Sequence, residues 1–215
     1  MPVPVLAVPA DGPEPRPATI SRSVAATRLD IAYGSVSKLV RCHILPLPIP
    51  AALVDKLAAR PDVVVAAGEL TVLRTGSKEP ADPAKHPQDE RKYIGFDMGH
   101  SDAELEETSL RWWRSDPDVV LDNEVFAITV ATVPVAVYRI TGHVGAYTRP
   151  DETRPRHHYA GQLLGRLRAD LEPAMRQDTP GHLRTLAEQI LRSRIRTSSG
   201  GPIAYLGGVE RPVVD

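Results

Sequence analysis

The sequence predicts an α+β protein in which a partly closed β-barrel or curved mixed sheet packs against C-terminal α-helices. Residues 125–140 are almost all β-branched, aromatic or small, and Pro134 divides them into two short runs typical of a β-hairpin. Residues 162–177 and 179–196 instead carry apolar side chains at helical spacing. Strands and helices that occupy separate parts of the chain favour the α+β class.

The chain begins with a proline-rich segment. Residues 1–20 lack the basic start and long apolar middle of a secretory signal, so we expect a disordered leader. Residues 21–215 are then expected to form a single α+β domain. The composition of residues 18–30 allows a short helix or a loop. Residues 37–45 have strand composition, and the LPLPIP that follows ends the strand.

A helix, a strand pair and a loop are expected next. Residues 49–60 have helical apolar spacing, with proline in the first turn and proline again after the last residue. Residues 62–73 read as two strands separated by Gly68. Residues 74–91 contain three prolines and many charges over 18 residues, which predicts a flexible loop.

The central part of the chain contains a helix start with a clear cap. Residues 92–99 are expected to form a short strand and residues 100–113 a helix. Ser101 is a suitable N-cap, and Glu104 stands three residues later, which is the spacing of a capping box. The hairpin follows, with its turn at residues 131–134, because a sheet tolerates proline only at a turn, an edge or a bulge.

The C-terminal third begins with a basic and aromatic loop at residues 147–159. Two helices are expected after it, at residues 162–177 and 179–196. Residues 198–206 read as a turn into a short strand, and residues 207–215 are expected to fray. One apolar stripe runs along the second helix: Leu183, Leu186, Ala187, Ile190, Leu191 and Ile195.

The net charge of −1 conceals an uneven distribution. Residues 1–137 carry 14 basic and 19 acidic residues, whereas residues 138–200 carry 11 arginines, no lysine and 6 acidic residues. Guanidinium groups suit phosphates and carboxylates well. A GC-rich genome is an alternative explanation for the missing lysines, but it does not explain the charge asymmetry.

Several classes of protein are disfavoured. The single cysteine, Cys42, excludes an internal disulfide and a cysteine-rich zinc site, and a reducing cytoplasmic location is expected. No apolar run approaches the roughly 20 residues of a membrane helix. His157 and His158 lack the spacing of a metal site, and no phosphate loop, nucleophile elbow or dinucleotide fingerprint is present. We therefore expect no metal and no cofactor, and a binding module is favoured over an enzyme.

Four short pieces carry a resemblance to a known group of domains. They are RWWRSDP at residues 111–117, FAITVATVPVAVYRI at 126–140, RHHYAGQL at 156–163 and GGPIAYL at 200–206. Their order resembles the PUA-like, EVE and ASCH-type β-barrel domains of bacterial restriction-associated proteins. The resemblance implies a barrel that reads nucleic acid, in some relatives by holding a modified or flipped base between aromatic rings. The two arginine-rich helices expected after Tyr159 depart from that pattern.

The predicted function is a nucleic-acid-binding module for DNA or RNA, as a modified-base reader of a mobile-element or defence system. Arginines would contact phosphates and aromatic rings would stack on bases. The candidate residues are Arg149, Arg154, Arg156, Arg166, Arg192, Arg194, Arg196, Trp112, Trp113, Tyr138 and Tyr159. A solvated helix face would also explain the arginines, and core packing would also explain the tryptophans.

Two alternative functions stay open. The apolar stripe of residues 183–195 would suit a protein-interaction component that forms homo-oligomers through its C-terminal helices. A hydrolase whose site is not visible from residue spacing is the other alternative.

Overall fold

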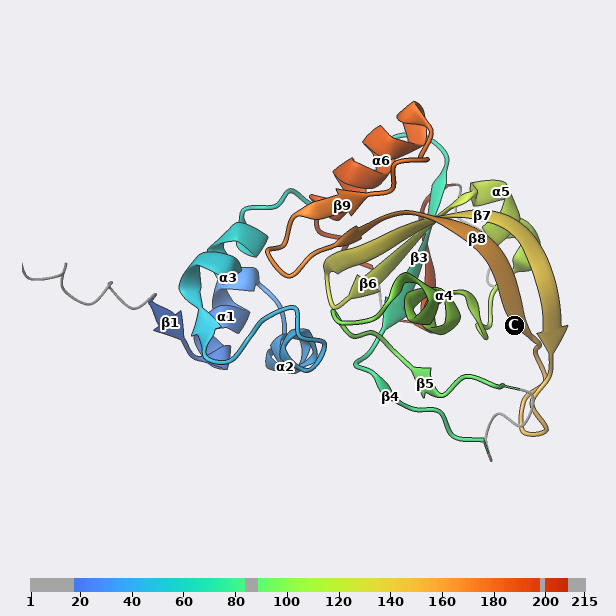
Figure 1. The fold of residues 1–215 in the computed structure, drawn as a ribbon, viewed down its shortest axis with the longest axis horizontal. Helices are drawn as coiled ribbons and strands as arrows, with labels where there is room; N and C mark the ends of the chain where they lie inside the picture. The colour runs from blue at the N-terminus through green and yellow to red at the C-terminus, as the bar shows by residue number, and fades with distance from the viewer. Residues whose placement is uncertain (1–17, 84–88, 198–199, 209–215) are drawn as a thin grey trace, which may run out of the picture.

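The computed structural model describes residues 18–83, 89–197 and 200–208. They form a small helical unit beside a larger sheet that carries its own helices (Figure 1). Most of the predicted leader and residues 209–215 lie outside the described residues.

The helical unit contains three helices and one short strand pair. Strand β1 (Thr19–Ile20) pairs antiparallel with β2 (Ile49–Pro50). Between them lie α1 (Arg22–Leu29) and α2 (Tyr33–Arg41), and α3 (Ala51–Ala58) follows β2 directly. A helix is therefore present where the sequence allowed either a helix or a loop, and the expected helix of residues 49–60 is confirmed as α3.

The main sheet has six strands and is mixed. Only the β3–β6 pair is parallel, and the other neighbours are antiparallel. In spatial order the strands are β10 (Ile203–Gly207), β3 (Glu69–Thr75), β6 (Val125–Val130), β7 (Val133–Tyr147), β8 (Arg156–Leu167) and β9 (Pro173–Met175).

The sheet is curved but open. Strands β7 and β8 bend together along their length (Figure 1), and register shifts interrupt their pairing. Strands β10 and β9 are the two edges and do not pair with each other. The α+β class is confirmed. The partly closed barrel is wrong for the described residues, because the edge strands stay apart.

The hairpin at the centre of the sheet matches its sequence prediction. Strands β6 and β7 pair antiparallel around a turn at Ala131 and Thr132. Pro134 lies at the start of β7, opposite Thr129, where the register shifts. Strand β7 extends to Tyr147, beyond the expected run, because β8 pairs with this additional length.

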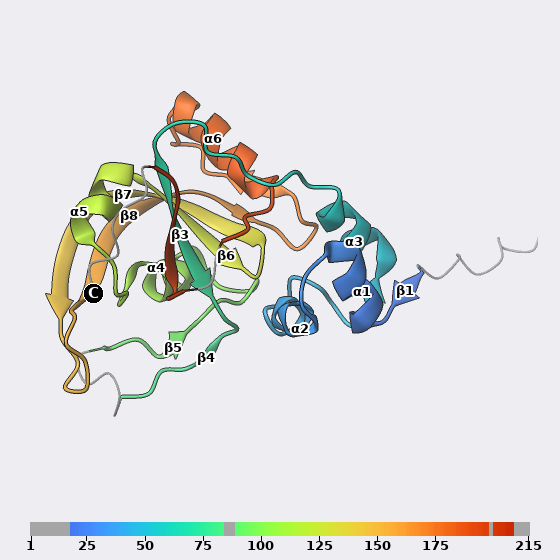
Figure 2. The same ribbon diagram turned by 180° about the vertical axis from the view of Figure 1, so that it is seen from behind.

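Helices cover both faces of the sheet. One face carries α6 (Gly181–Leu191), and the other carries α4 (Asp102–Leu110), α5 (Pro117–Asn123) and part of the helical unit (Figures 1 and 2). Successive residues of β6 alternate between the two cores: Phe126, Ile128 and Val130 pack on the second face, and Val125 and Ala127 pack against α6.

Two expected elements are of the wrong type. Residues 37–45 were expected as a strand, but most of them belong to α2, whose Val36 and Leu39 are buried at helical spacing. Residues 162–177 were expected as a helix, but they form the end of β8 and all of β9. Long antiparallel pairing with β7 overrides the helical pattern there.

Other boundaries differ from the prediction. Residues 62–73 contain one strand, β3, and the strand expected between residues 62 and 68 is absent. Strands β4 (Glu79–Pro80) and β5 (Tyr93–Ile94) pair across the expected flexible loop. At its end, a buried ion pair joins Arg91 to Asp89 at 2.5 Å. The loop is therefore ordered near both ends.

The predicted helix boundaries are partly correct. The capping box of Ser101 and Glu104 is present at the start of α4, which ends at Leu110, before the tryptophans. Helix α6 begins at Gly181, two residues after the expected start, with Pro180 as its N-cap, and ends at Leu191. It is the longest described helix at 11 residues, and none of the described helices has the length and apolarity required to span a bilayer.

Candidate nucleic-acid interface

Helices α1 and α2 form a helix–turn–helix arrangement. A three-residue turn, residues 30–32, joins them. Asp30 adopts a left-handed conformation with φ 51° and ψ 53°, which aspartate tolerates better than most residues. The amide of Ile31 donates to Ala26 O at 3.1 Å, closing the end of α1. In the DNA-binding proteins that use a helix–turn–helix, the second helix enters the major groove.

The apolar interior of the helical unit is continuous with the core on one face of the sheet. Ser21 caps α1 by accepting a hydrogen bond from Val24 N at 3.3 Å. Two alanines of α1 are buried, so α2 and α3 can approach its backbone closely. The buried side chains of the three helices are Ala25, Ala26, Leu29, Val36, Leu39, Val54 and Leu57.

The opposite side of α2 faces solvent. Tyr33 is 56 % exposed, and Gly34, Lys38 and Arg41 are also exposed. Helical geometry places Gly34, Lys38 and Arg41 on one side, because they are separated by three, four or seven positions, and Tyr33 lies beside them at the first position of the helix. Figures 1 and 2 show α2 close to end-on, whereas α1 and α3 are seen from the side. Helix α2 therefore crosses its neighbours steeply.

The charge of this surface favours a polyanion. Residues 18–60 hold six basic and two acidic residues, although the whole chain has a net charge of −1. Helix α2 contains no acidic residue. Lys38 and Arg41 form no ion pair with any described carboxylate, whereas Arg28 of α1 is paired with Asp55 of α3 at 2.9 Å.

One ion pair attaches the end of α2 to the rest of the protein. His43 Nδ1 lies 2.8 Å from Asp97 Oδ2, and Met98 N donates to Cys42 O at 3.0 Å. Burial opposes ionisation of Asp97, but hydrogen bonds from Gly99 N and His43 outweigh it and lower the pKa of Asp97. The carboxylate is therefore charged at neutral pH and holds α2 in place.

The four predicted stacking residues are mostly enclosed. Tyr138 and Tyr159 are 0 % and 1 % exposed, so neither ring can stack on a base. Trp112 packs edge-on against Tyr147 and His158, and Trp113 is half-buried with its indole N–H bonded to Ser109 O at 2.7 Å. Core packing, the alternative explanation, accounts for their positions.

The predicted arginines of the β7–β8 end are engaged with acidic neighbours. Arg149 pairs with Asp151 at 2.8 Å, and Arg156 pairs with Glu152 at 2.6 Å. The hydrogen bond to Glu152 raises the pKa of Arg156 despite its partial burial. Arg154 is exposed in the same loop.

The remaining predicted arginines lie elsewhere. Arg166 of β8 bonds to Asp102 of α4 at 3.0 Å, and Arg192 pairs with Glu172 and Glu188. Figures 1 and 2 place α6 and the β7–β8 loop at opposite ends of the sheet. The seven arginines therefore do not form one phosphate-binding face.

Two of these arginines support the helix–turn–helix arrangement instead. Arg194 is buried, and its guanidinium donates to Leu29 O at the end of α1. Burial lowers the pKa of Arg194. Arg196 pairs with Asp30 of the turn at 3.0 Å and with Asp62 at 3.2 Å. Both arginines therefore attach the turn between α1 and α2 to the segment that follows α6.

The histidines do not form a metal site within the described parts of the chain. His157 Nδ1 lies 3.0 Å from His143 Nε2, and burial together with the charge of His143 lowers the pKa of His157. No group of three histidine, cysteine or acidic side chains is placed to hold an ion there. Ser115 Oγ and Tyr159 OH lie 2.6 Å apart and share a hydrogen bond.

Sequence reasoning missed the helix pair because residues 37–45 were read as a strand. The available signal was the spacing of Val36, Leu39 and Val40, continued backwards through Leu29 and Ile31. All five are buried or half-buried in the structure.

Comparisons of the chain with protein-family models, with curated proteins and with solved structures give no match.

Proposed function

We propose that this protein binds double-stranded DNA through the helix–turn–helix arrangement of α1 and α2. The observation that carries the proposal is the exposed, acid-free side of α2, presented by a second helix that follows a three-residue turn. Nucleic-acid binding thus stays the proposed function, but the proposed binding surface is α2 and not the arginine-rich segment of residues 138–200.

Each part of the surface has a role in this proposal. The N-terminal turn of α2, with Tyr33 and Gly34, would reach base edges in the major groove. Lys38 and Arg41, further along the same side, would contact phosphates. Their lack of carboxylate partners among the described residues favours this role, because no intramolecular ion pair has to be broken first.

The test is fluorescence anisotropy with a labelled duplex of random sequence, at salt concentrations from about 50 to 200 mM. We expect binding that weakens steeply with salt. The double variant Lys38→Ala/Arg41→Ala should bind at least tenfold more weakly, with a salt slope smaller by about 2, because each lost phosphate contact reduces it by about 1.

The matched control removes the same charge from the β7–β8 loop. The double variant Arg149→Ala/Arg154→Ala should bind DNA like the unaltered protein. If this control lost DNA affinity and the α2 variant did not, the DNA interface would lie on the arginine-rich segment. Absence of binding at the lowest salt would remove the DNA proposal altogether.

The structure gives less support to oligomerisation through the C-terminal helix. Leu183, Ala187, Ile190 and Leu191 of α6 pack on the sheet of their own chain. Only Leu186 of the predicted stripe is strongly exposed, at 40 %. The stripe is therefore mostly used in intramolecular packing.

A further inference from the structure

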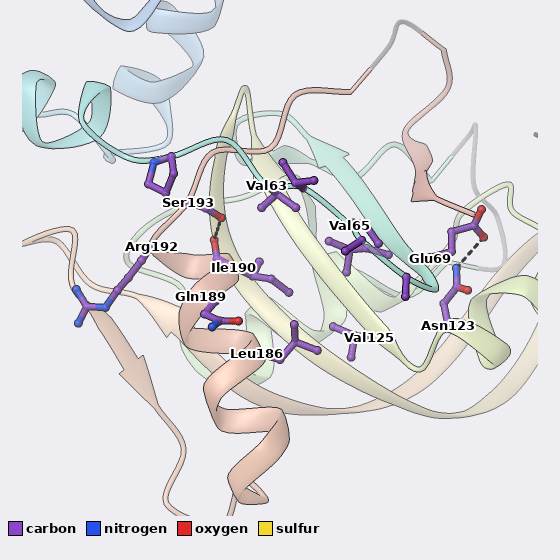
Figure 3. A pocket seen from close by; sticks show the side chains of 15 residues that line it. Val63, Val65, Glu69, Asn123, Val125, Leu186, Gln189, Ile190, Arg192 and Ser193 are labelled. Atoms are coloured by element: carbon purple, nitrogen blue, oxygen red, sulfur yellow. Dashed lines mark hydrogen bonds between the residues drawn. The ribbon is translucent and has the colours of Figure 1, made fainter. Parts of the chain in front are cut away.

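A pocket of about 670 Å³ lies between α6 and residues 59–68, the connector that joins α3 to β3. Figure 3 shows Leu186 and Ile190 of α6 across the pocket from Val63 and Val65 of the connector. Its apolar lining is completed by Leu70 and Val125 on the sheet. We call it the α6 pocket.

Both ends of the α6 pocket carry polar side chains: Gln189, Arg192 and Ser193 line one end, and Glu69 and Asn123 line the other. The Asn123 amide group donates to Glu69 Oε2 at 3.1 Å and to Thr71 Oγ1 at 3.0 Å (Figure 3). These bonds orient the side chain so that its Oδ1 atom accepts no hydrogen bond from the described residues. The amide oxygen of Asn123 is a hydrogen-bond acceptor, so this end suits a hydrogen-bond donor.

The size of the α6 pocket favours a small molecule over a second protein chain. Ligand sites typically enclose about 300–1,000 Å³ with mostly apolar walls and a few polar groups. A stable dimer instead buries about 800 Å² on each partner. Of the strongly exposed large apolar side chains, only Val64 and Leu186 border this pocket.

The walls of the pocket are connected to the helix–turn–helix arrangement. The connector is fixed to the segment after α6 by two backbone hydrogen bonds of 2.8 Å, from Arg194 N to Pro61 O and from Val63 N to Arg194 O. The side chain of Arg194 then bonds to Leu29 O, at the end of α1. A ligand that moved the connector relative to α6 would therefore move the support of the turn.

We propose that the α6 pocket binds an apolar small molecule carrying a hydroxyl or amino group, and that its occupation changes the affinity of α1 and α2 for DNA. The second half of this inference rests on the proposed function, and the first half does not. Such coupling is reciprocal, so DNA changes the affinity for the ligand by the same factor.

The probe for the site is 1-aminoanthracene, an apolar fluorophore with one amino group, titrated into the full chain. We expect saturable binding to one site. Leu186→Glu, which places a charge at the pocket wall, should weaken binding at least tenfold. The matched control is Leu121→Glu, because Leu121 of α5 is 37 % exposed and lies outside the pocket lining. Circular dichroism spectra of both variants establish that they fold.

The second measurement repeats the DNA titration with saturating probe. A change of about fivefold or more in the DNA Kd, absent in Leu186→Glu, is the expected result. An unchanged Kd would overturn the coupling. Lack of saturable probe binding, or a dimer by light scattering that Leu186→Glu dissociates, would overturn the ligand site. Probe binding without any DNA binding would retain the site and refute the proposed function and the coupling that rests on it.

Discussion

Removing one hydroxyl group from each of two buried tyrosines should change stability in opposite directions. Tyr138 and Tyr159 are both enclosed in the same core. The hydroxyl of Tyr138 has no hydrogen-bond partner among the described residues, whereas that of Tyr159 lies 2.6 Å from Ser115 Oγ. Burial raises the pKa of Tyr138 far above its usual range and that of Tyr159 to about 12, so both are neutral.

The magnitudes follow from what each hydroxyl contributes. A buried hydroxyl without a partner destabilises a protein by about 1–3 kcal/mol. Tyr138→Phe removes that penalty together with a small amount of packing, so we expect a gain of about 1 kcal/mol. Tyr159→Phe loses a hydrogen bond that contributes about 0.5–1.5 kcal/mol. Two changes of the same chemistry should therefore differ by about 2 kcal/mol.

The assay is urea unfolding followed by circular dichroism, with the slope m compared between variants. For a chain of this length, about 2 kcal/mol corresponds to a difference in Tm of roughly 4–8 °C. Ser115→Ala is the control, and it should reproduce the loss seen in Tyr159→Phe. If Tyr138→Phe is destabilised by more than about 0.5 kcal/mol at unchanged m, its hydroxyl is hydrogen-bonded in solution and the reasoning is refuted.

Three further outcomes are expected. Burial raises the pKa of Cys42 to about 12, so a disulfide reagent should modify it only as fast as the protein unfolds, and rapid labelling of the native protein would contradict this. Gly95→Ala should lower the free energy of unfolding in urea by more than about 1 kcal/mol. Gly95 has φ 81°, and an added Cβ would lie 2.2 Å from the backbone oxygen of Ser77. The control Gly142→Ala, where a Cβ meets open space, should leave the free energy of unfolding nearly unchanged. Hydrogen bonds from the Ser101 amide and hydroxyl lower the pKa of Glu104 from 4.5 to about 2, so its stabilising contribution is present above pH 4.5 and lost as the pH falls towards 2. The stability difference between the native protein and Glu104→Gln should shrink over that interval, and a constant difference would contradict the capping role.

Local signals in the sequence predicted the elements whose structure depends on near neighbours. The capping box at Ser101 and the turn before Pro134 are both present, because each is determined by residues within four positions. The start of α6 was predicted to within two residues for the same reason.

Long-range pairing explains the main failure. Residues 162–177 have apolar spacing suited to a helix, but the first part of the segment pairs with β7 and residues 173–175 pair with β8. Gly165 pairs with Val137 of β7 on one side and with Met175 of β9 on the other, and Val137 comes from another part of the chain. No pattern within the segment itself indicates those partners.

The sequence predicts an arginine-rich site and not the proposed site on α2, because total charge was counted without the ion pairs that the fold makes. The arginines of residues 149–196 are indeed numerous, but most of them form ion pairs with acidic side chains from several parts of the chain. Lys38 and Arg41 are only two charges in an acidic first half, and they have no such partners among the described residues. Exposure and pairing are properties of the fold, so composition could not separate the two groups.

The attachment of the helical unit has a consequence for biosynthesis. Its supports, Arg194 and Arg196, and the strand that covers the edge of β3 are among the last described residues to be translated. Roughly 160 residues separate α2 from β10, which is about 8–30 s of translation. During that interval the nascent chain exposes an apolar strand edge and an undocked helix pair, so we expect it to depend on chaperones while it is on the ribosome.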